Sequence, residues 1–300
     1  MLALALLSIS LSCTEGKNEG PSQHRQQAKH IILFGTDGLG AYAFKEAAIP
    51  SIRKMMDNGS YSLKTRSVLP SSSAVNWASM LMGSGPELHG YTEWGSKTPE
   101  LPSRKIGKGG IYPSIISLID EQLPEAKKGV AYTWNGIGYL FEKNMVDLDF
   151  NGENDEETVE KALEFLVKHK PVFTFIHVDE PDHAGHAFGH DTPAYYSALK
   201  KVDSLVGKVI STLEKEQMMS ESVIILSSDH GGVNKGHGGK SLLEVEVPWI
   251  VYGKGIRKQR VEQTVVTYDT GATIAYLLGL TPPEFWRGKP ITSIVAKSIR

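Results

Sequence analysis

The sequence predicts an α/β protein with a mostly parallel central sheet and helices on both faces. Short apolar segments alternate with longer amphipathic ones along most of the chain, which is typical of parallel strands joined by crossover helices. Several apolar segments end in aspartate and glycine, where ligand-binding residues of such sheets gather. With 300 residues, 40% of them hydrophobic, the chain can bury one large core.

Five segments have the composition of buried strands. Each is a short apolar run that stops at a turn or at polar residues. In HIILFGTDGLG, for example, Gly-Asp-Gly follows the apolar run directly, and we expect the folded domain to begin near His30. The five predicted strand segments are 30–40, 129–135, 171–182, 222–231 and 247–256.

Six segments have the spacing of helices. The segment 154–170 carries acids in its first turn and bases in its last turn, as the helix dipole favours. The segment 71–83 begins with three serines after Pro70, which suits a helix N-terminus. The predicted helices are 49–59, 71–83, 112–123, 154–170, 192–217 and 269–280, and residues 91–112 are expected to form a loop over the sheet edge.

The N-terminal segment differs from the rest. Residues 1–13 are apolar and end at Cys13, the single cysteine, and residues 14–29 are polar enough for a flexible tether. This arrangement resembles a bacterial lipoprotein signal, and the alternative is a disordered or buried apolar N-terminus. We therefore expect export to the periplasm or outer membrane with a lipid on Cys13 as the membrane contact, followed by one catalytic domain over residues 30–300.

The charge pattern restricts the partners. The formal net charge is −2 and no long basic run occurs, which argues against binding to a nucleic-acid duplex.

Acids and histidines gather in the segments that follow the predicted strands. Six of the ten histidines lie between residues 177 and 237. Asp182 and His186 are four residues apart, so that a helical turn would place them on one face. Carboxylate and imidazole are the usual zinc ligands outside thiolate sites. The candidate ligands are too many for one tetrahedral ion and indicate two ions: Asp37, Asp182, His186, Asp229, His230 and His237.

A nucleophile for such a site is offered by Ser71, Ser72 and Ser73. They lie at a predicted helix N-terminus, where free N–H groups and the helix dipole favour an alkoxide and a bound phosphate. Two divalent cations would balance the charge of three aspartates and one alkoxide. The residues alone do not select one serine, and a serine at a helix start is common without any catalytic role.

The ordered set of motifs resembles the alkaline phosphatase superfamily. The motifs are TDG, PSSS with Asn76 three residues on, MLMG followed by PELHG, EPDHAGH, SDHG and HG. Together they are most similar to the type I phosphodiesterase / nucleotide pyrophosphatase branch and cover nearly all of residues 30–295. The resemblance implies an alkaline-phosphatase-like three-layer sandwich and a hydrolase of small phosphorylated substrates, such as nucleotides, that uses two zinc ions.

The resemblance also assigns roles by position. One ion would be held by Asp182, His186 and His237. The other would be held by Asp37, Asp229 and His230, with Ser73 as the nucleophile that also binds this ion and Ser72 as the alternative nucleophile.

Some features depart from the branch. The branch carries threonine where Ser73 stands, and it carries an asparagine near the position of Trp94 that contacts the phosphoryl group. Asn76, Asn135 or Lys240 would have to replace that contact, and Trp94 could line the substrate pocket. The sulfatase motif C/S-x-P-x-R is missing from PSSSAVN, which excludes a typical sulfatase. A phosphomonoesterase and a non-catalytic metal-binding surface protein remain alternatives.

Residues near the motifs have simpler expected roles. His177 lies within an apolar strand and is expected in the core, as is Trp77. His183 and His190 are expected at the surface or behind the metal ligands. Trp134 fits either the core or the pocket wall.

Overall fold

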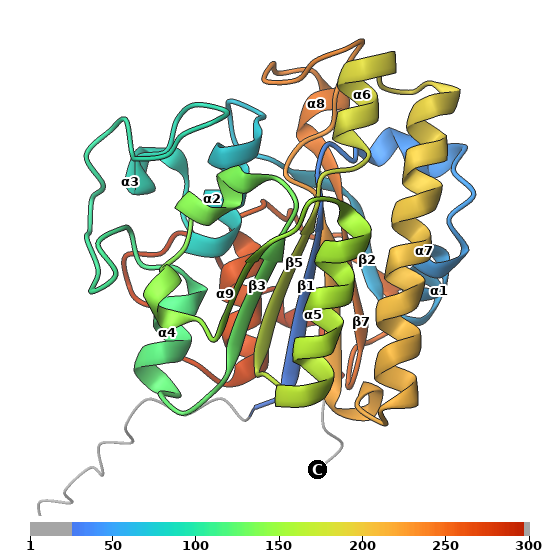
Figure 1. Ribbon diagram of the computed structural model, residues 1–300. Helices are drawn as coiled ribbons and strands as arrows, with labels where there is room; N and C mark the ends of the chain where they lie inside the picture. Colours follow the sequence, from blue (N-terminus) through green and yellow to red (C-terminus); the bar gives the residue numbers. More distant parts are fainter. Residues whose placement is uncertain (1–25, 297–300) are drawn as a thin grey trace, which may run out of the picture.

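An eight-stranded sheet forms the centre of the computed structural model, which describes residues 26–296 (Figure 1). The strand order is β4-β3-β5-β1-β6-β7-β2-β8. The predicted signal over 1–13, Cys13 and most of the predicted tether lie outside the described residues. The strands are β1 (His30–Thr36), β2 (Ser60–Arg66), β3 (Lys128–Tyr132), β4 (Leu148–Asn151), β5 (Phe173–Val178), β6 (Ser222–Ser227), β7 (Glu246–Gly253) and β8 (Gln259–Arg260).

The strand pairing confirms the predicted mostly parallel sheet. β7 runs antiparallel to β6 and β2, and the other pairs are parallel. β1 lies between β5 and β6, and Gly35 is paired with His177 on one side and with Ser227 on the other. The three central strands therefore end at the same level, and the residues after them share one rim of the sheet, which we call the carboxyl rim.

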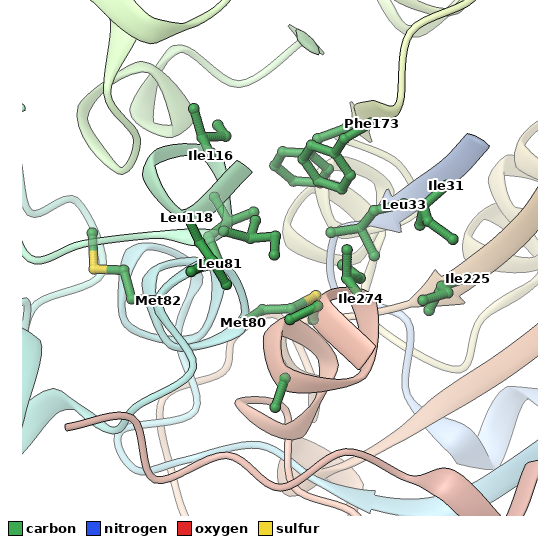
Figure 2. Close-up of a cluster of buried hydrophobic side chains, with 14 of the residues drawn as sticks. Ile31, Leu33, Met80, Leu81, Met82, Ile116, Leu118, Phe173, Ile225 and Ile274 are labelled. Atoms are coloured by element: carbon green, nitrogen blue, oxygen red, sulfur yellow. The ribbon is translucent and has the colours of Figure 1, made fainter. Parts of the chain in front are cut away.

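Helices cover both faces of the sheet, as the alternating pattern predicts (Figure 1). The period of two in β1 sends Ile31 and Leu33 to one face and Ile32 and Phe34 to the other. Figure 2 shows part of the first core, where β1 meets Met80 of α2 and Ile274 of α9. One face is covered by α2 (Ser73–Met82), α4 (Ile115–Gln122) and α9 (Asp269–Leu278), and the other by α1 (Pro50–Asn58), α5 (Asp155–His169) and α7 (Pro193–Lys215).

Short elements lie mainly in the connections. Three short α-helices are α3 (Pro86–His89), α6 (Asp182–Phe188) and α8 (Leu242–Val245), and α6 and α8 lie beyond one end of the sheet (Figure 1). Residues 91–112 contain neither helix nor strand, as predicted. Within residues 26–296, no helix is both long and apolar enough to cross a membrane. The 3-10 helices are Ala41–Lys45, Asn135–Tyr139, Lys143–Met145, Met219–Glu221 and Thr292–Ile294.

The sequence did not predict β2 or β4. The fully buried positions of β2 are the small polar residues Ser60, Ser62 and Thr65, and only Tyr61 and Leu63 alternate with them as apolar residues, which is too short a pattern to mark a strand. β4 is an edge strand of four residues in which buried and exposed positions are barely distinguished. Both strands are fixed by their neighbours in the sheet.

Candidate metal and phosphoester site

Three aspartates meet at the carboxyl rim, each supplied by a different central strand. Asp37 follows β1, Asp229 follows β6, and Asp182 begins α6 just after β5. All three are buried, with 2%, 0% and 8% of their surface exposed. Because isolated buried carboxylates are costly, this clustering needs a compensating positive charge or protons.

Asp37 is held by two ring donors. The Nε1–H of Trp77 donates to Asp37 Oδ2 at 3.0 Å, and His177 Nε2 lies 3.0 Å from the same oxygen. The other oxygen, Oδ1, is buried and has no hydrogen-bond partner. Trp77 and His177 are core residues, as predicted, but they also orient Asp37 so that one oxygen remains available to a cation. The sequence did not reveal this contact, because the pair lies 40 and 140 positions from Asp37.

The three candidate histidine ligands share one hydrogen-bonding pattern. The Nδ1 atoms of His230, His186 and His237 lie 2.8, 2.9 and 3.1 Å from the backbone oxygens of Gly231, Lys235 and Ser71. A carbonyl oxygen can only accept, so Nδ1 carries the proton in each neutral ring and Nε2 carries the lone pair. The backbone thus fixes the tautomer in which Nε2 can bind a metal.

The ligand atoms form two groups. Those of Asp182, His186 and His237, which we call the open group, lie within 4.8 Å of one another. Those of Asp37, Asp182 and His230 form a second set with the same spacing. Asp182 therefore takes part in both sets, whereas the motif assignment placed it in one.

Asp229 is nevertheless adjacent to the second set. Its Oδ2 lies 3.1 Å from His230 Nε2, and His230 Nε2 lies 3.4 Å from Asp37 Oδ1. Asp229 Oδ1 accepts from the backbone N–H of Gly38 at 3.2 Å. We call Asp37, Asp229 and His230 the buried group. Its free ligand atoms converge on His230 Nε2.

The electrostatics of the site fit a divalent cation. Burial and the charges of Asp37 and Asp182 raise the pKa of Asp229 well above its usual range. Burial also opposes ionisation of Asp37, but the His177 hydrogen bond and the charge of His230 hold the pKa of Asp37 below its usual range. Asp37 Oδ1, Asp182 Oδ1 and Asp229 Oδ2 are all buried without partners. Oxygen and nitrogen donors of this kind suit two divalent ions, zinc among them.

The open group holds a proton in the absence of metal. His186 Nε2 lies 3.2 Å from Asp182 Oδ2, and this hydrogen bond raises the pKa of His186 to about 9. Burial lowers the pKa of His237. A cation that binds here would displace the proton of His186.

Ser73 is the serine that faces the two groups. It is the first residue of α2, and its Oγ lies 3.2 Å from His230 Nε2. It lines a cavity of about 190 Å³, here called the Ser73 cavity, together with Asp37, Asp182, His186 and His237. Ser71 Oγ instead donates to the Gly239 carbonyl oxygen, and Ser72 Oγ is buried without a partner.

The N-terminus of α2 is less open than the sequence suggests. The backbone N–H of Ala74 donates to the carbonyl oxygen of Trp94 at 3.1 Å, so this donor is not available to a phosphate. The contact places Trp94 beside the serine. Trp94 has 66% of its surface exposed and lines the Ser73 cavity, as does Trp134.

Asn76 has a structural role, and the prediction that it contacts substrate is wrong. Its Oδ1 accepts from the Val68 N–H at 2.7 Å and from Thr267 Oγ1 at 3.2 Å. Its Nδ2 donates to backbone oxygens of Val68, Pro70 and Ser72. The side chain is fully buried, so Asn76 ties the segment before α2 to the helix and has no polar atom left for a ligand. Lys240 is exposed and does not line the Ser73 cavity.

Three further residues border the site without having been singled out as ligands. His190 is buried, with Nε2 3.7 Å from Asp182 Oδ1 and Nδ1 3.3 Å from Tyr42 Oη, and burial lowers its pKa to about 4. Asp179 lines the Ser73 cavity, and burial and the charge of Asp37 raise its pKa to about 6. His183 lines the same cavity. The sequence predicts His190 either at the surface or behind the metal ligands, and in the structure it is buried behind Asp182.

The chain resembles known proteins over most of its length. The profile of the family "Type I phosphodiesterase / nucleotide pyrophosphatase" matches residues 31–238. The chain is 27% identical over 278 residues to ectonucleotide pyrophosphatase/phosphodiesterase family member 1 of Mus musculus, covering 85% of this chain and 30% of that protein. It is 22% identical to the venom phosphodiesterase of Macrovipera lebetinus, covering 75% of this chain and 27% of that protein. The chain thus spans about a third or less of the length of these relatives.

Solved structures show the same fold. An inactive form of murine ectonucleotide pyrophosphatase/phosphodiesterase 5, in complex with AMP, superposes with a TM-score of 0.75 at 15% identity. The match covers 89% of this chain and all of that chain. A 2-O GAG sulfatase superposes with a TM-score of 0.71 at 16% identity, over 91% of this chain and 76% of that chain. The alkaline-phosphatase-like fold predicted from the motifs is confirmed.

Proposed function

Because the chain belongs to the type I phosphodiesterase / nucleotide pyrophosphatase family, we propose that it is a metal-dependent hydrolase of phosphoric diesters that uses Ser73 as nucleophile. One observation carries the proposal: Ser73 Oγ lies 3.2 Å from His230 Nε2, beside two sets of ligand atoms that share Asp182. The relatives that are named phosphodiesterases and pyrophosphatases support the same reaction class.

The two ligand groups would hold two divalent ions, and the mixed carboxylate and imidazole donors favour zinc. The open group would hold one ion through Asp182, His186 and His237, and the buried group the other through Asp37, Asp229 and His230. Bound there, the ions supply Lewis-acid stabilisation of the attacking and departing oxygens.

The reaction at Ser73 follows from its place. Ser73 Oγ gives its proton to solvent and attacks phosphorus, a serine O–P bond forms, and the bond from phosphorus to the leaving oxygen breaks. The leaving group departs with a proton from solvent. Water then cleaves the phosphoseryl ester and returns the serine hydroxyl. Trp77 and His177 hold Asp37 in place throughout, so that its free oxygen keeps one position.

A phosphomonoesterase is the second candidate, favoured by a serine rather than a threonine at position 73 and by Trp94 near the place of the family asparagine. Hydrolysis of p-nitrophenyl phosphate and of bis-p-nitrophenyl phosphate by the same preparation compares the two reactions. We expect kcat/KM to favour the diester by about a hundredfold, or roughly 2.7 kcal/mol. A preference of that size for the monoester would replace the proposed class.

The test of the nucleophile combines substitution with metal removal. Ser73→Ala is expected to lower kcat by at least about a thousandfold, because several kcal/mol of barrier lowering depend on this oxygen. The variant should keep the metal content and thermal midpoint of the wild type. Chelation of the wild type should abolish activity, and added Zn²⁺ should restore it.

A companion variant separates the neighbouring hydroxyls. Ser72→Ala is expected to lose at least tenfold less activity than Ser73→Ala. The reverse order would move the nucleophile to Ser72. If wild type and Ser73→Ala both bind zinc but show equal, negligible turnover on mono-, di- and sulfate esters, the chain is a metal-binding protein without this activity.

A further inference from the structure

A second cavity adjoins the Ser73 cavity. It has a volume of about 570 Å³, within the range of small-molecule sites, and we call it the side cavity. Trp94, His186 and His237 line both cavities. The side cavity therefore borders the open group directly, and a ligand could pass from one cavity to the other along Trp94.

The position of the side cavity relates it to the departing group of a substrate. Ser73 Oγ lies against His230, which belongs to the buried group. The side cavity is lined by His186 and His237, which belong to the open group. In a displacement at phosphorus the attacking and leaving oxygens lie roughly in line on opposite sides. A leaving group opposite Ser73 would then extend past the open group toward the side cavity.

Trp94 is held in place despite its exposure. Its carbonyl oxygen accepts from the N–H of Ala74, the residue after Ser73. The loop around it is closed by Glu100, whose Oε2 accepts from Thr92 N at 2.7 Å and from Ser96 Oγ at 2.8 Å. A large aromatic side chain that is 66% exposed, on a backbone held beside a site, offers a flat apolar face to a ligand.

As far as the chain is described, the walls of the side cavity carry no lysine or arginine beside the open group. No lysine or arginine is among the described residues that line either cavity. Glu93 lines the side cavity, and Asp179 lines the Ser73 cavity in addition to the ligand carboxylates. Apart from the open-group histidines, which would hold an ion, the described lining of the side cavity offers no cationic side chain to pair with the charges of a pyrophosphate leaving group, and Glu93 would face those charges.

We propose, on the basis of the proposed function, that the side cavity binds the leaving group of the substrate and selects an apolar or aromatic group without negative charge. Trp94 provides the stacking face. Glu93 repels anionic leaving groups. The favoured substrates are accordingly diesters of uncharged aromatic or apolar alcohols, and nucleoside triphosphates are disfavoured.

The test uses two substrates that transfer the same thymidylyl group. Thymidine 5′-monophosphate p-nitrophenyl ester releases an aromatic alcohol, and thymidine triphosphate releases pyrophosphate. Trp94→Ala should lower kcat/KM for the nitrophenyl ester about tenfold, mainly through KM, and change the value for the triphosphate by less than about twofold. Glu93→Lys should raise kcat/KM for the triphosphate about tenfold and leave the nitrophenyl ester within about twofold.

Controls address folding and nonspecific charge. Leu101→Ala removes another exposed apolar side chain of the same loop, and Glu284→Lys makes the same charge change at an exposed position outside both cavities. Both should match the wild type on both substrates. The thermal midpoint and zinc content of Trp94→Ala should also match, because the indole is exposed.

The outcomes separate the two proposals. If the nitrophenyl ester is hydrolysed but Trp94→Ala and Glu93→Lys change both substrates equally or not at all, the leaving-group assignment is wrong and the hydrolase function stands. If the zinc-loaded wild type hydrolyses neither substrate nor any other phosphoric ester, the hydrolase function fails and the assignment fails with it.

Discussion

The buried group and the open group use similar ligands in opposite surroundings. Asp37, Asp229 and His230 of the buried group have at most 2% of their surface exposed. In the open group the His186 side chain is 48% exposed, and His237 is partly exposed. The buried ligands follow the central strands β1 and β6, whereas the open ligands lie on the short helix α6 and on a glycine-rich turn.

This contrast indicates different tasks for the two groups. In the buried group, side-chain and backbone donors of the core hold the carboxylates, including Trp77, His177 and the Gly38 N–H. Two carboxylates buried beside one imidazole leave a strong need for positive charge. The open group has access to water, which can complete the coordination of an ion there and can be exchanged for substrate. The buried group is thus suited to structure and activation, and the open group to exchange.

The largest expected effect comes from removing one candidate ligand from each group and comparing the losses of activity. Asp37→Asn keeps the shape of the side chain but removes a buried charge, and we expect kcat/KM for the nitrophenyl diester to fall by about a thousandfold or more. His186→Asn should cost about tenfold to a hundredfold, because water can occupy an exposed ligand position. Kinetics and zinc per chain measure both variants. Equal losses, or a larger loss for His186→Asn, would contradict the contrast.

A smaller effect is expected from the residues that orient Asp37. His177→Gln and Trp77→Phe each remove or weaken a donor to Asp37 Oδ2 while keeping the side chain large. We expect the protein's affinity for the more tightly bound of the two zinc ions to fall about tenfold to a hundredfold. A competition titration with a zinc chelator measures this. His89→Gln, which changes a buried histidine outside both groups, should leave the affinity unchanged; a similar drop there would mean that the loss reflects general destabilisation.

His89 also provides an effect on stability, because it is a buried histidine outside both groups. Its Nδ1 accepts from the Tyr91 N–H at 3.1 Å and its Nε2 lies 2.9 Å from Ser79 Oγ, a pattern that suits the neutral ring. Burial lowers the pKa of His89 from 6.5 to about 3. Between these values the unfolded chain binds a proton that the folded chain does not.

The stabilisation from neutral His89 is therefore complete above pH 6.5 and is lost as the pH falls toward 3. Its contribution to the slope of unfolding free energy is at most about 1.4 kcal/mol per pH unit. Urea unfolding of the chelated protein at pH 6.5, 5.5 and 4.5 should show a shallower pH dependence for His89→Gln than for the wild type. Parallel curves would show that His89 does not titrate in this window.

The sequence predicts the sheet and the gathering of the three aspartates at its rim, because both depend on short local patterns. The apolar runs of β1, β5 and β6 are unmistakable, and the aspartates after them must share a rim once the strands are parallel. The sequence does not predict β2, because the buried positions of this strand are serine and threonine. Its place depends on pairing with β7, which no local pattern encodes.

Within the site, spacing indicates which residues reach the rim but not where each side-chain atom points. The motif order could not show that Asp182 takes part in both ligand sets, since that depends on how α6 follows β5. Nor could it show that the Asn76 amide is used up by the backbone before α2, or that His177 reaches across β1 to Asp37. These contacts join residues that are distant in sequence, and only the folded arrangement defines them.

The loop that carries Trp94 and Glu93 has a consequence for how such a protein can diversify. Glu100 ties the loop to itself, and the Ala74 contact that joins it to α2 is made by backbone atoms. Side chains at its tip can therefore be replaced in evolution without moving any ligand of the two groups. Descendants of this chain could acquire a new binding preference by local changes of a few codons while inheriting both groups unaltered.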